Sequence, residues 1–93
     1  MLILNGTAEY MSTNGTPVKG DRHSFNMFVK SDDLDSQLSE IEDYLIKRDW
    51  DNIEITDNGL IENIEGISHS VLIEAFKKAQ SEGLSVVINN LPI

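Results

Sequence analysis

Side chains in two segments near the start of the chain alternate between apolar and polar. In the first segment, residues 2 to 11, these residues fall on one side of an extended chain: Leu2, Leu4, Gly6, Ala8 and Tyr10. Residues 24 to 30 also alternate, although Phe28 breaks the pattern. A period of two predicts half-buried strands. Residues 12 to 23 have no apolar periodicity, and we expect them to form a mobile connecting loop.

Two later segments have the apolar spacing of helices. In the first, the apolar residues recur at intervals of four, three and four: Leu34, Leu38, Ile41 and Leu45. This spacing predicts one buried stripe of a helix. The second predicted helix follows Ser68, and its inner stripe consists of Leu72, Ala75, Phe76 and Ala79. Gly83 stands where a left-handed C-terminal cap is expected.

Further strands are predicted between the helices and at the end of the chain. Ile53 and Ile55 alternate with polar residues, and Asn58-Gly59 follows. An Asn-Gly pair of this kind predicts a tight hairpin turn, so we expect a returning strand over residues 60 to 65. A final strand begins near residue 84 and ends at Pro92.

The order of these elements predicts the fold class. From Phe25 onward the order is strand, helix, strand, strand, helix, strand, which is the split arrangement of ferredoxin-like domains. We therefore expect an α+β two-layer sandwich, with both helices on one face of a mainly antiparallel sheet. The strand at residues 2 to 11 is an extra N-terminal strand without a defined place in the sheet. The length of 93 residues indicates a single domain spanning residues 1–93.

The composition is that of a folded intracellular domain. Hydrophobic residues make up 40% of the chain, too many for a disordered protein, and there is no cysteine. Without cysteine the chain has no disulfide, thiolate nucleophile or cysteine-type zinc site, and a reducing compartment is favoured. Neither a secretory signal nor an apolar run of about 20 residues is found. We expect a cytoplasmic protein that does not bind membranes.

The negative charge of the chain is concentrated in its middle third. The formal net charge is −9, and residues 32 to 66 hold twelve carboxylates against only Lys47 and Arg48. This segment therefore sums to −10, whereas the first 31 residues sum to +1 and the last 27 to zero. Such a field repels nucleic acid and anionic membranes, and it speeds the encounter with a basic partner.

The acidic segment suggests a binding function. With the apolar stripe of the first helix facing inward, its carboxylates project outward. We predict a non-enzymatic binding protein, of an immunity, inhibitor or adaptor type, that engages a basic protein through residues 32–66. The partner-binding residues that we predict are Asp32, Asp35, Glu40, Asp43, Glu54 and Glu62. The competing interpretation is a solvated helix face that only keeps a small protein soluble.

A second hypothesis uses the sheet instead of the acidic segment. If both helices cover one face, the other face carries Ile3, Phe28 and Val87 among polar residues. Aromatic and aliphatic anchors inside a polar rim are typical of interfaces. This face therefore predicts a homodimer, which would act as a small-ligand or regulatory module with a pocket near the loop at residues 12 to 23.

Motifs for metal, phosphate or carbohydrate chemistry are incomplete. An EF-hand counted from Asp49 has Glu54 and Leu60 where glycine and glutamate are required. The glycine-spaced loop at residues 15–20 is followed by Asp and Arg instead of Lys and Ser/Thr. The Asn-Gly-Thr sequences at residues 5–7 and 14–16 are glycosylation acceptors only in a secreted protein.

The two histidines do not assemble a catalytic or metal site. His69 stands between two serines at the start of the second predicted helix, where neighbouring side chains point apart. His23 lies in the predicted loop and has no metal-ligand partner at a suitable spacing. We therefore predict no enzymatic activity, no cofactor and no metal.

Overall fold

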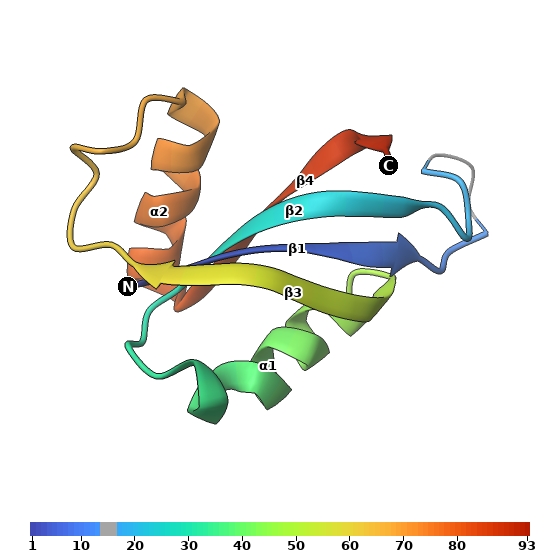
Figure 1. Ribbon diagram of the computed structural model, residues 1–93, viewed down its shortest axis with the longest axis horizontal. Helices are drawn as coiled ribbons and strands as arrows, with labels where there is room; N and C mark the ends of the chain where they lie inside the picture. Colours follow the sequence, from blue (N-terminus) through green and yellow to red (C-terminus); the bar gives the residue numbers. More distant parts are fainter. Residues whose placement is uncertain (14–16) are drawn as a thin grey trace.

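The computed structural model describes residues 1–13 and 17–93 (Figure 1). Its elements in chain order are β1 (Leu2–Tyr10), β2 (Arg22–Val29), α1 (Leu34–Ile46), β3 (Trp50–Leu60), α2 (Ser70–Glu82) and β4 (Leu84–Pro92). Residues 14–16, which include the second Asn-Gly-Thr sequence and the first glycine of the glycine-spaced loop, lie outside the described residues. The same residues belong to the connecting loop predicted over residues 12 to 23. The last two residues of that prediction, Arg22 and His23, are instead the start of β2.

The four strands form one antiparallel sheet in the order β3-β1-β2-β4. β1 and β2 form a hairpin whose register runs from Leu2 opposite Val29 to Glu9 opposite Arg22. β3 and β4 are the two edge strands (Figure 1). The predicted α+β class with an antiparallel sheet and two helices is confirmed. The sequence did not predict the position of the N-terminal strand in the sheet. In the structure this strand is β1, and it lies between β3 and β2.

The hairpin predicted at Asn58-Gly59 does not form. Both residues belong to β3 and pair with β1, where Leu4 lies opposite Asn58 and Ile3 opposite Gly59. Neither has the positive φ that a tight hairpin turn of this type requires. Pairing with the long, apolar β1 thus prevails over the local turn preference. The predicted returning strand does not form, because Leu60 ends β3 and residues 61 to 65 are not in a strand. The ferredoxin-like order is not confirmed, because the observed order is ββαβαβ.

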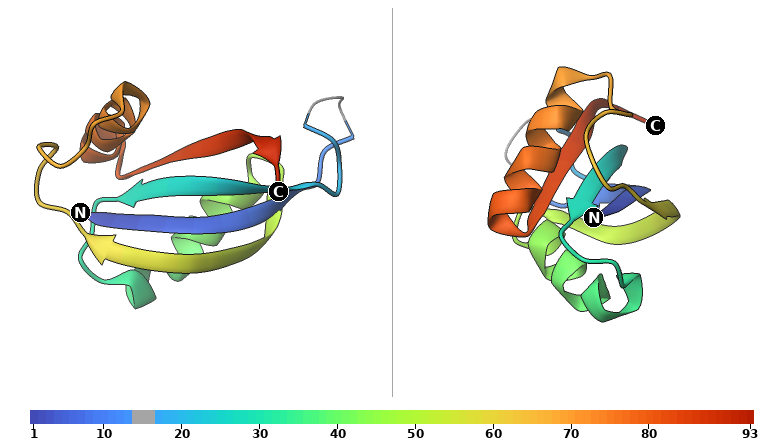
Figure 2. Two further views of the ribbon diagram at one scale, coloured as in Figure 1. Left: turned by 45° about the horizontal axis from the view of Figure 1, so that its top comes forward. Right: turned by 90° about the vertical axis from the view of Figure 1, so that its left-hand side faces the viewer.

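The two helices pack on opposite faces of the sheet. Met27, Phe28 and Val29 are consecutive residues of β2 and are 0%, 0% and 1% exposed, so both faces of this strand are covered. Met27 and Val29 belong to the core beneath α1, whereas Phe28 belongs to the core beneath α2. In the end-on view of Figure 2, β4 lies between the two helices. The prediction that both helices share one face is therefore wrong.

The core beneath α1 is the larger of the two. Its buried residues are Leu2, Leu4, Ala8, Phe25, Met27, Val29, Ile41, Leu45 and Trp50. Trp50, at the start of β3, packs on Tyr10 and His23, with ring centroids 4.9 Å and 5.3 Å away. This core holds α1 against the sheet through Ile41 and Leu45, the last two residues of its predicted stripe, whereas Leu38 of the same stripe is 38% exposed.

The core beneath α2 is compact. Its buried residues are Phe28, Ala75, Phe76 and Ala79. The rings of Phe28 and Phe76 meet edge to face at 5.8 Å, a favourable aromatic geometry. The buried hydroxyl of Ser85 donates a hydrogen bond to the carbonyl oxygen of Ala75, which ties β4 to the helix. Gly83 ends α2 with φ +95°, as its position in the sequence predicted.

We predict that Gly6→Ala destabilises the fold by roughly 1–3 kcal/mol, the usual cost of overpacking. A Cβ at residue 6 would lie 2.3 Å from the carbonyl oxygen of Glu54 and 2.8 Å from the Phe25 ring. Gly59→Ala is the matched control, because its nearest neighbour would be a methyl carbon of Ile3 at 3.9 Å. Urea unfolding of both variants measures the difference. Equal midpoints for the two variants would contradict this account of Gly6.

Candidate protein-binding surface

The outer side of α1 is covered with carboxylates. Ile41 and Leu45 are buried against the sheet, which leaves the opposite side of the helix in water. The exposed acidic residues of this helix are Asp35, Glu40, Glu42 and Asp43. The outward position that the helical spacing predicted for Asp35, Glu40 and Asp43 is therefore observed.

These carboxylates have no basic partner within ion-pair distance. In the described part of the chain, the ion pairs are Asp32 with the amino group of Met1 and Lys78 with Glu82. Lys47 lies one helical turn after Asp43 but forms no ion pair with it. In the described part of the chain, no Lys or Arg side chain therefore forms an ion pair with a carboxylate of α1.

The basic residue at the end of α1 is held by another contact. The Nη1 atom of Arg48 donates a hydrogen bond of 2.9 Å to the carbonyl oxygen of Tyr44, and its guanidinium lies 3.5 Å above the centre of the Tyr44 ring. The first contact satisfies a free carbonyl at the helix end, and the second is a cation–π interaction. Arg48 therefore caps α1 and forms no ion pair with its carboxylates.

A shallow groove runs between α1 and the start of β4. Its volume is about 290 Å³, and its lining residues are Glu40, Asp43, Tyr44, Lys47, Arg48 and Leu84. The groove places two carboxylates and two basic side chains next to an aromatic ring and an aliphatic side chain. Surfaces with this mixture of polar and aromatic groups are common in protein interfaces.

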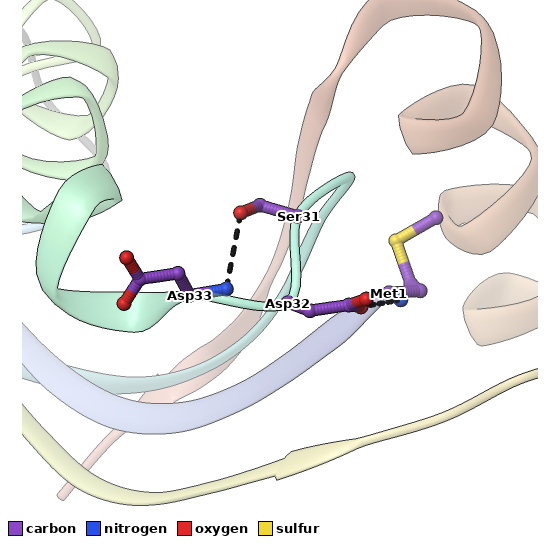
Figure 3. Close-up of polar contacts among 4 residues, drawn as sticks. All are labelled: Met1, Ser31, Asp32 and Asp33. Carbon is purple, nitrogen blue, oxygen red and sulfur yellow. Dashed lines mark hydrogen bonds and ion pairs between the residues drawn. The ribbon is translucent and has the colours of Figure 1, made fainter.

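Asp32 lies before α1 and is partly engaged by the chain itself. Its Oδ1 atom is 3.1 Å from the amino group of Met1 (Figure 3). The carboxylate is 83% exposed, so this pair contributes little to stability. Figure 3 also shows the amide of Asp33 donating to the Ser31 hydroxyl at 3.1 Å. This bond orders the turn that leads into the helix.

Glu54 and Glu62 do not lie on α1. Ile53 and Ile55 pack toward the core beneath α1, so the alternation of β3 turns Glu54 toward the opposite face. On that face it lies opposite Thr7, whose hydroxyl accepts a hydrogen bond from Arg22. Glu62 is in the connection between β3 and α2. The structure thus brings together Asp35, Glu40 and Asp43 and separates Glu54 and Glu62 from them.

The predicted dimer face is covered within one chain. Phe28 is 0% exposed beneath α2, and Ile3 and Val87 are partly buried against the same core. The prediction of an open face centred on these three residues is therefore wrong, because α2 packs on it. The sequence carried one sign of this arrangement, since an apolar Phe28 out of phase with its neighbours is typical of a strand buried on both faces.

His23 is a structural residue of β2 and not a loop residue. It is 2% exposed, and its Nδ1 atom lies 2.7 Å from the carbonyl oxygen of Asn89. Its Nε2 atom is buried and has no hydrogen-bond partner among the described residues. A cavity of about 200 Å³ lies next to His23 and the predicted loop. It is lined by Pro17, Val18, Asp21, His23, Asn90 and Pro92.

A larger pocket lies where α2 begins above the sheet. Its volume is about 530 Å³, and its lining residues are Asn26, His69, Ser70, Val71, Leu72, Val87 and Asn89. Most of the lining is apolar, with amide groups contributed by the sheet. Among the residues that the structure describes, no three His, Cys, Asp or Glu side chains are grouped to hold a metal ion.

Comparisons with known proteins show no relative of this chain. No protein-family model, no curated protein and no solved structure matches it. Neither α1 nor α2 is long and apolar enough to cross a membrane, within the part of the chain that the structure describes.

We predict that Phe28→Ala lowers the free energy of unfolding by about 3–5 kcal/mol, because it leaves a cavity between the sheet and α2. Leu60→Ala is the control: Leu60 is 64% exposed, and its truncation should cost less than about 0.5 kcal/mol. Urea unfolding gives both values. If Phe28 belonged to an interface between copies, its truncation would instead lower the solution mass and leave the monomer stable.

Proposed function

We propose that this protein is a non-enzymatic binding protein that engages a basic protein through the outer side of α1. The observation that supports the proposal is the set of exposed carboxylates on one helix, none of which has a basic partner in the described chain. A partner that carries Lys and Arg would supply the missing charges.

The helix presents these carboxylates on a stable support. Ile41 and Leu45 are both 0% exposed in the core, and Arg48 holds the last turn through Tyr44. A surface that is already ordered loses little conformational freedom when a partner binds. Rigid presentation therefore favours the use of this helix as a recognition element.

The distribution of charge distinguishes this surface from an ordinary soluble helix. α2 is also amphipathic, but Glu74 and Glu82 on it are balanced by Lys77 and Lys78. Solubility alone does not require one helix to be acidic and the other neutral. A one-sided field of this kind steers a basic partner toward α1, and its effect weakens as salt rises.

The groove beside α1 supports a protein as the partner. Glu40 and Asp43 line it together with Tyr44 and Leu84. A basic side chain of the partner could meet the carboxylates, while a neighbouring apolar side chain contacts the ring and Leu84. We propose cytoplasmic recognition of this kind, without nucleic acid or membrane as the target.

The test is a pull-down from the host lysate with the tagged protein at about 0.05 M and about 0.5 M salt, since salt screens exposed charges. The partner captured at low salt is then purified, and its Kd is measured. We expect Asp35→Asn/Glu40→Gln/Asp43→Asn to raise the Kd at least about tenfold, or about 1.4 kcal/mol.

The matched control is Glu54→Gln/Glu62→Gln/Glu74→Gln. It also removes three exposed carboxylates, so both triple variants have a formal net charge of −6 instead of −9. Binding lost only in the α1 variant would support the proposal. Equal weakening by both variants would show that binding depends on the net charge of the protein and not on the position of the carboxylates on α1. Unchanged binding by the α1 variant would refute the proposal.

A second candidate function is supported by the pocket at the start of α2. Ligand pockets are typically about 300–1,000 Å³, largely apolar and equipped with a few polar groups. The pocket of about 530 Å³ fits this description, with Asn26 and Asn89 as the polar groups from the sheet. We propose binding of a small, partly apolar ligand there as the alternative function.

Thermal unfolding with a panel of metabolites tests this alternative. A ligand at about one hundred times its Kd stabilises the fold by about 2.7 kcal/mol, which raises Tm by several degrees. Val71→Glu should remove the shift, because Val71 lines the pocket yet is 58% exposed, so the fold tolerates the change. A shift that persists in this variant would place the ligand elsewhere, and a panel without any shift would count against the alternative.

A further inference from the structure

The two edges of the sheet differ in how they are protected. β3 and β4 each pair with one strand only, so each has a row of backbone groups without a strand partner. β3 carries Asp51, Glu54 and Asp57, and its pairing with β1 is interrupted by two register shifts. Charged residues and bulges are the usual means by which proteins prevent edge-to-edge association. The β3 edge is therefore protected.

The first half of the β4 edge has neither charged side chains nor register shifts. Residues 84–93 include no charged side chain. The pairing of β4 with β2 is regular from Leu84 to Ile88, and its register shift comes only after that segment. The segment contains Val86, Val87 and Ile88, which favour extended structure. A straight, uncharged edge of this type is suited to pairing with another strand.

The hydrogen-bonding groups of this segment can be assigned from the ladder. The amide of Lys30 donates to the carbonyl oxygen of Gly83 at 2.8 Å, next to the pair of Val29 and Leu84. Antiparallel ladders alternate between bonded and non-bonded pairs. The backbone groups of Ser85 and Val87 therefore face β2, and those of Leu84, Val86 and Ile88 face away from it. No strand lies beyond β4 in the described part of the chain.

We propose that β4 pairs antiparallel with β4 of a second copy of this chain, about a two-fold axis at Val86. In this arrangement Val86 lies opposite Val86 of the other copy, and Leu84 lies opposite Ile88 of the other copy. All three residues present their N–H and C=O groups at the edge, so the segment is complementary to itself. Symmetric pairing of this kind closes after two copies, whereas head-to-tail pairing continues into fibres.

The side chains of the same residues support a second copy as the occupant. Leu84, Val86 and Ile88 contact the core beneath α1 but are only partly buried. Across the two-fold axis they would pack against the same three residues of the other copy. Aliphatic pairs across neighbouring strands stabilise a sheet, and they remove apolar surface from water.

Charge also selects this edge for self-association. Two copies meeting at β3 would bring Asp51, Glu54 and Asp57 of one copy against those of the other. Meeting at β4 instead leaves the β3 carboxylates at the two outer edges of the joined sheet. A chain with a net charge of −9 therefore associates with itself most easily through its uncharged strand.

Solution mass tests the pairing without any partner protein, so its outcome is independent of the function proposed for α1. Sedimentation equilibrium from roughly 10 μM to roughly 1 mM covers the range of weak association. We expect a mass of about twice 10.4 kDa at the upper end. A mass that remains at 10.4 kDa throughout would overturn the proposal.

Val86→Pro tests the edge itself. Proline removes an outward N–H, so the ladder with β2 keeps its bonds while the second copy loses its contact at the axis. We expect a folded monomer. Asn58→Pro is the matched control: the amide of Ile61 donates to the carbonyl oxygen of Met1, next to the pair of Leu2 and Leu60, so the alternation places the amide of Asn58 on the outer edge of β3. That variant should remain dimeric, and a dimer that persists in Val86→Pro would overturn the proposal.

Amide exchange of the unaltered protein decides the question if Val86→Pro does not fold. At high concentration, we expect the amides of Leu84, Val86 and Ile88 to be protected as well as those of Ser85 and Val87. On dilution, only the amides of Leu84, Val86 and Ile88 should begin to exchange rapidly, since these amides bond to the second copy. Rapid exchange of these three amides at every concentration would overturn the proposal.

Discussion

The structure depends on the burial of β2 on both of its faces. Met27 and Val29 pack toward α1, while Phe28 packs toward α2 and meets Phe76 edge to face. One strand therefore anchors both helices. The alanines of α2 let it approach the sheet closely enough for Ser85 to bond to the carbonyl of Ala75. Without an apolar residue at position 28, α2 would lose the fully buried apolar side chain beneath it, because Ile3 and Val87 are only partly buried against the same core.

This arrangement determines which surfaces remain free. Because each helix has a face of the sheet to itself, α1 buries one side only and leaves its carboxylates in water. β3 and β4 lie at opposite edges, so the charged edge and the uncharged edge are separated by the width of the sheet. The acidic side of α1 is suited to a basic protein and the uncharged strand β4 to a second copy of the chain, and the two surfaces adjoin at Leu84.

Part of the candidate site could be predicted from helical spacing alone. Asp35, Glu40 and Asp43 are outward because Ile41 and Leu45 are inward, and this relation is local to one helix. Glu54 could not be placed in the same way. Its neighbours Ile53 and Ile55 are apolar, so the alternation shows that Glu54 points away from an apolar core. Only the position of α1 shows that Glu54 therefore lies on the face of the sheet that is opposite to α1. The lone signal for a second covered face was Phe28, which interrupts an otherwise regular alternation.

The sequence by itself determined the helices, most of the strands, the antiparallel α+β class and the acidic side of α1. These features follow from periodicities of two and 3.6 residues and from charges that are close together along the chain. Only the tertiary structure decided that Asn58-Gly59 continues β3, that His23 is buried beside Trp50, and that the helices lie on opposite faces. Each of these outcomes depends on contacts between residues far apart in sequence. Local patterns show which side of an element is apolar, but the free energy of long-range packing and pairing selects what covers that side.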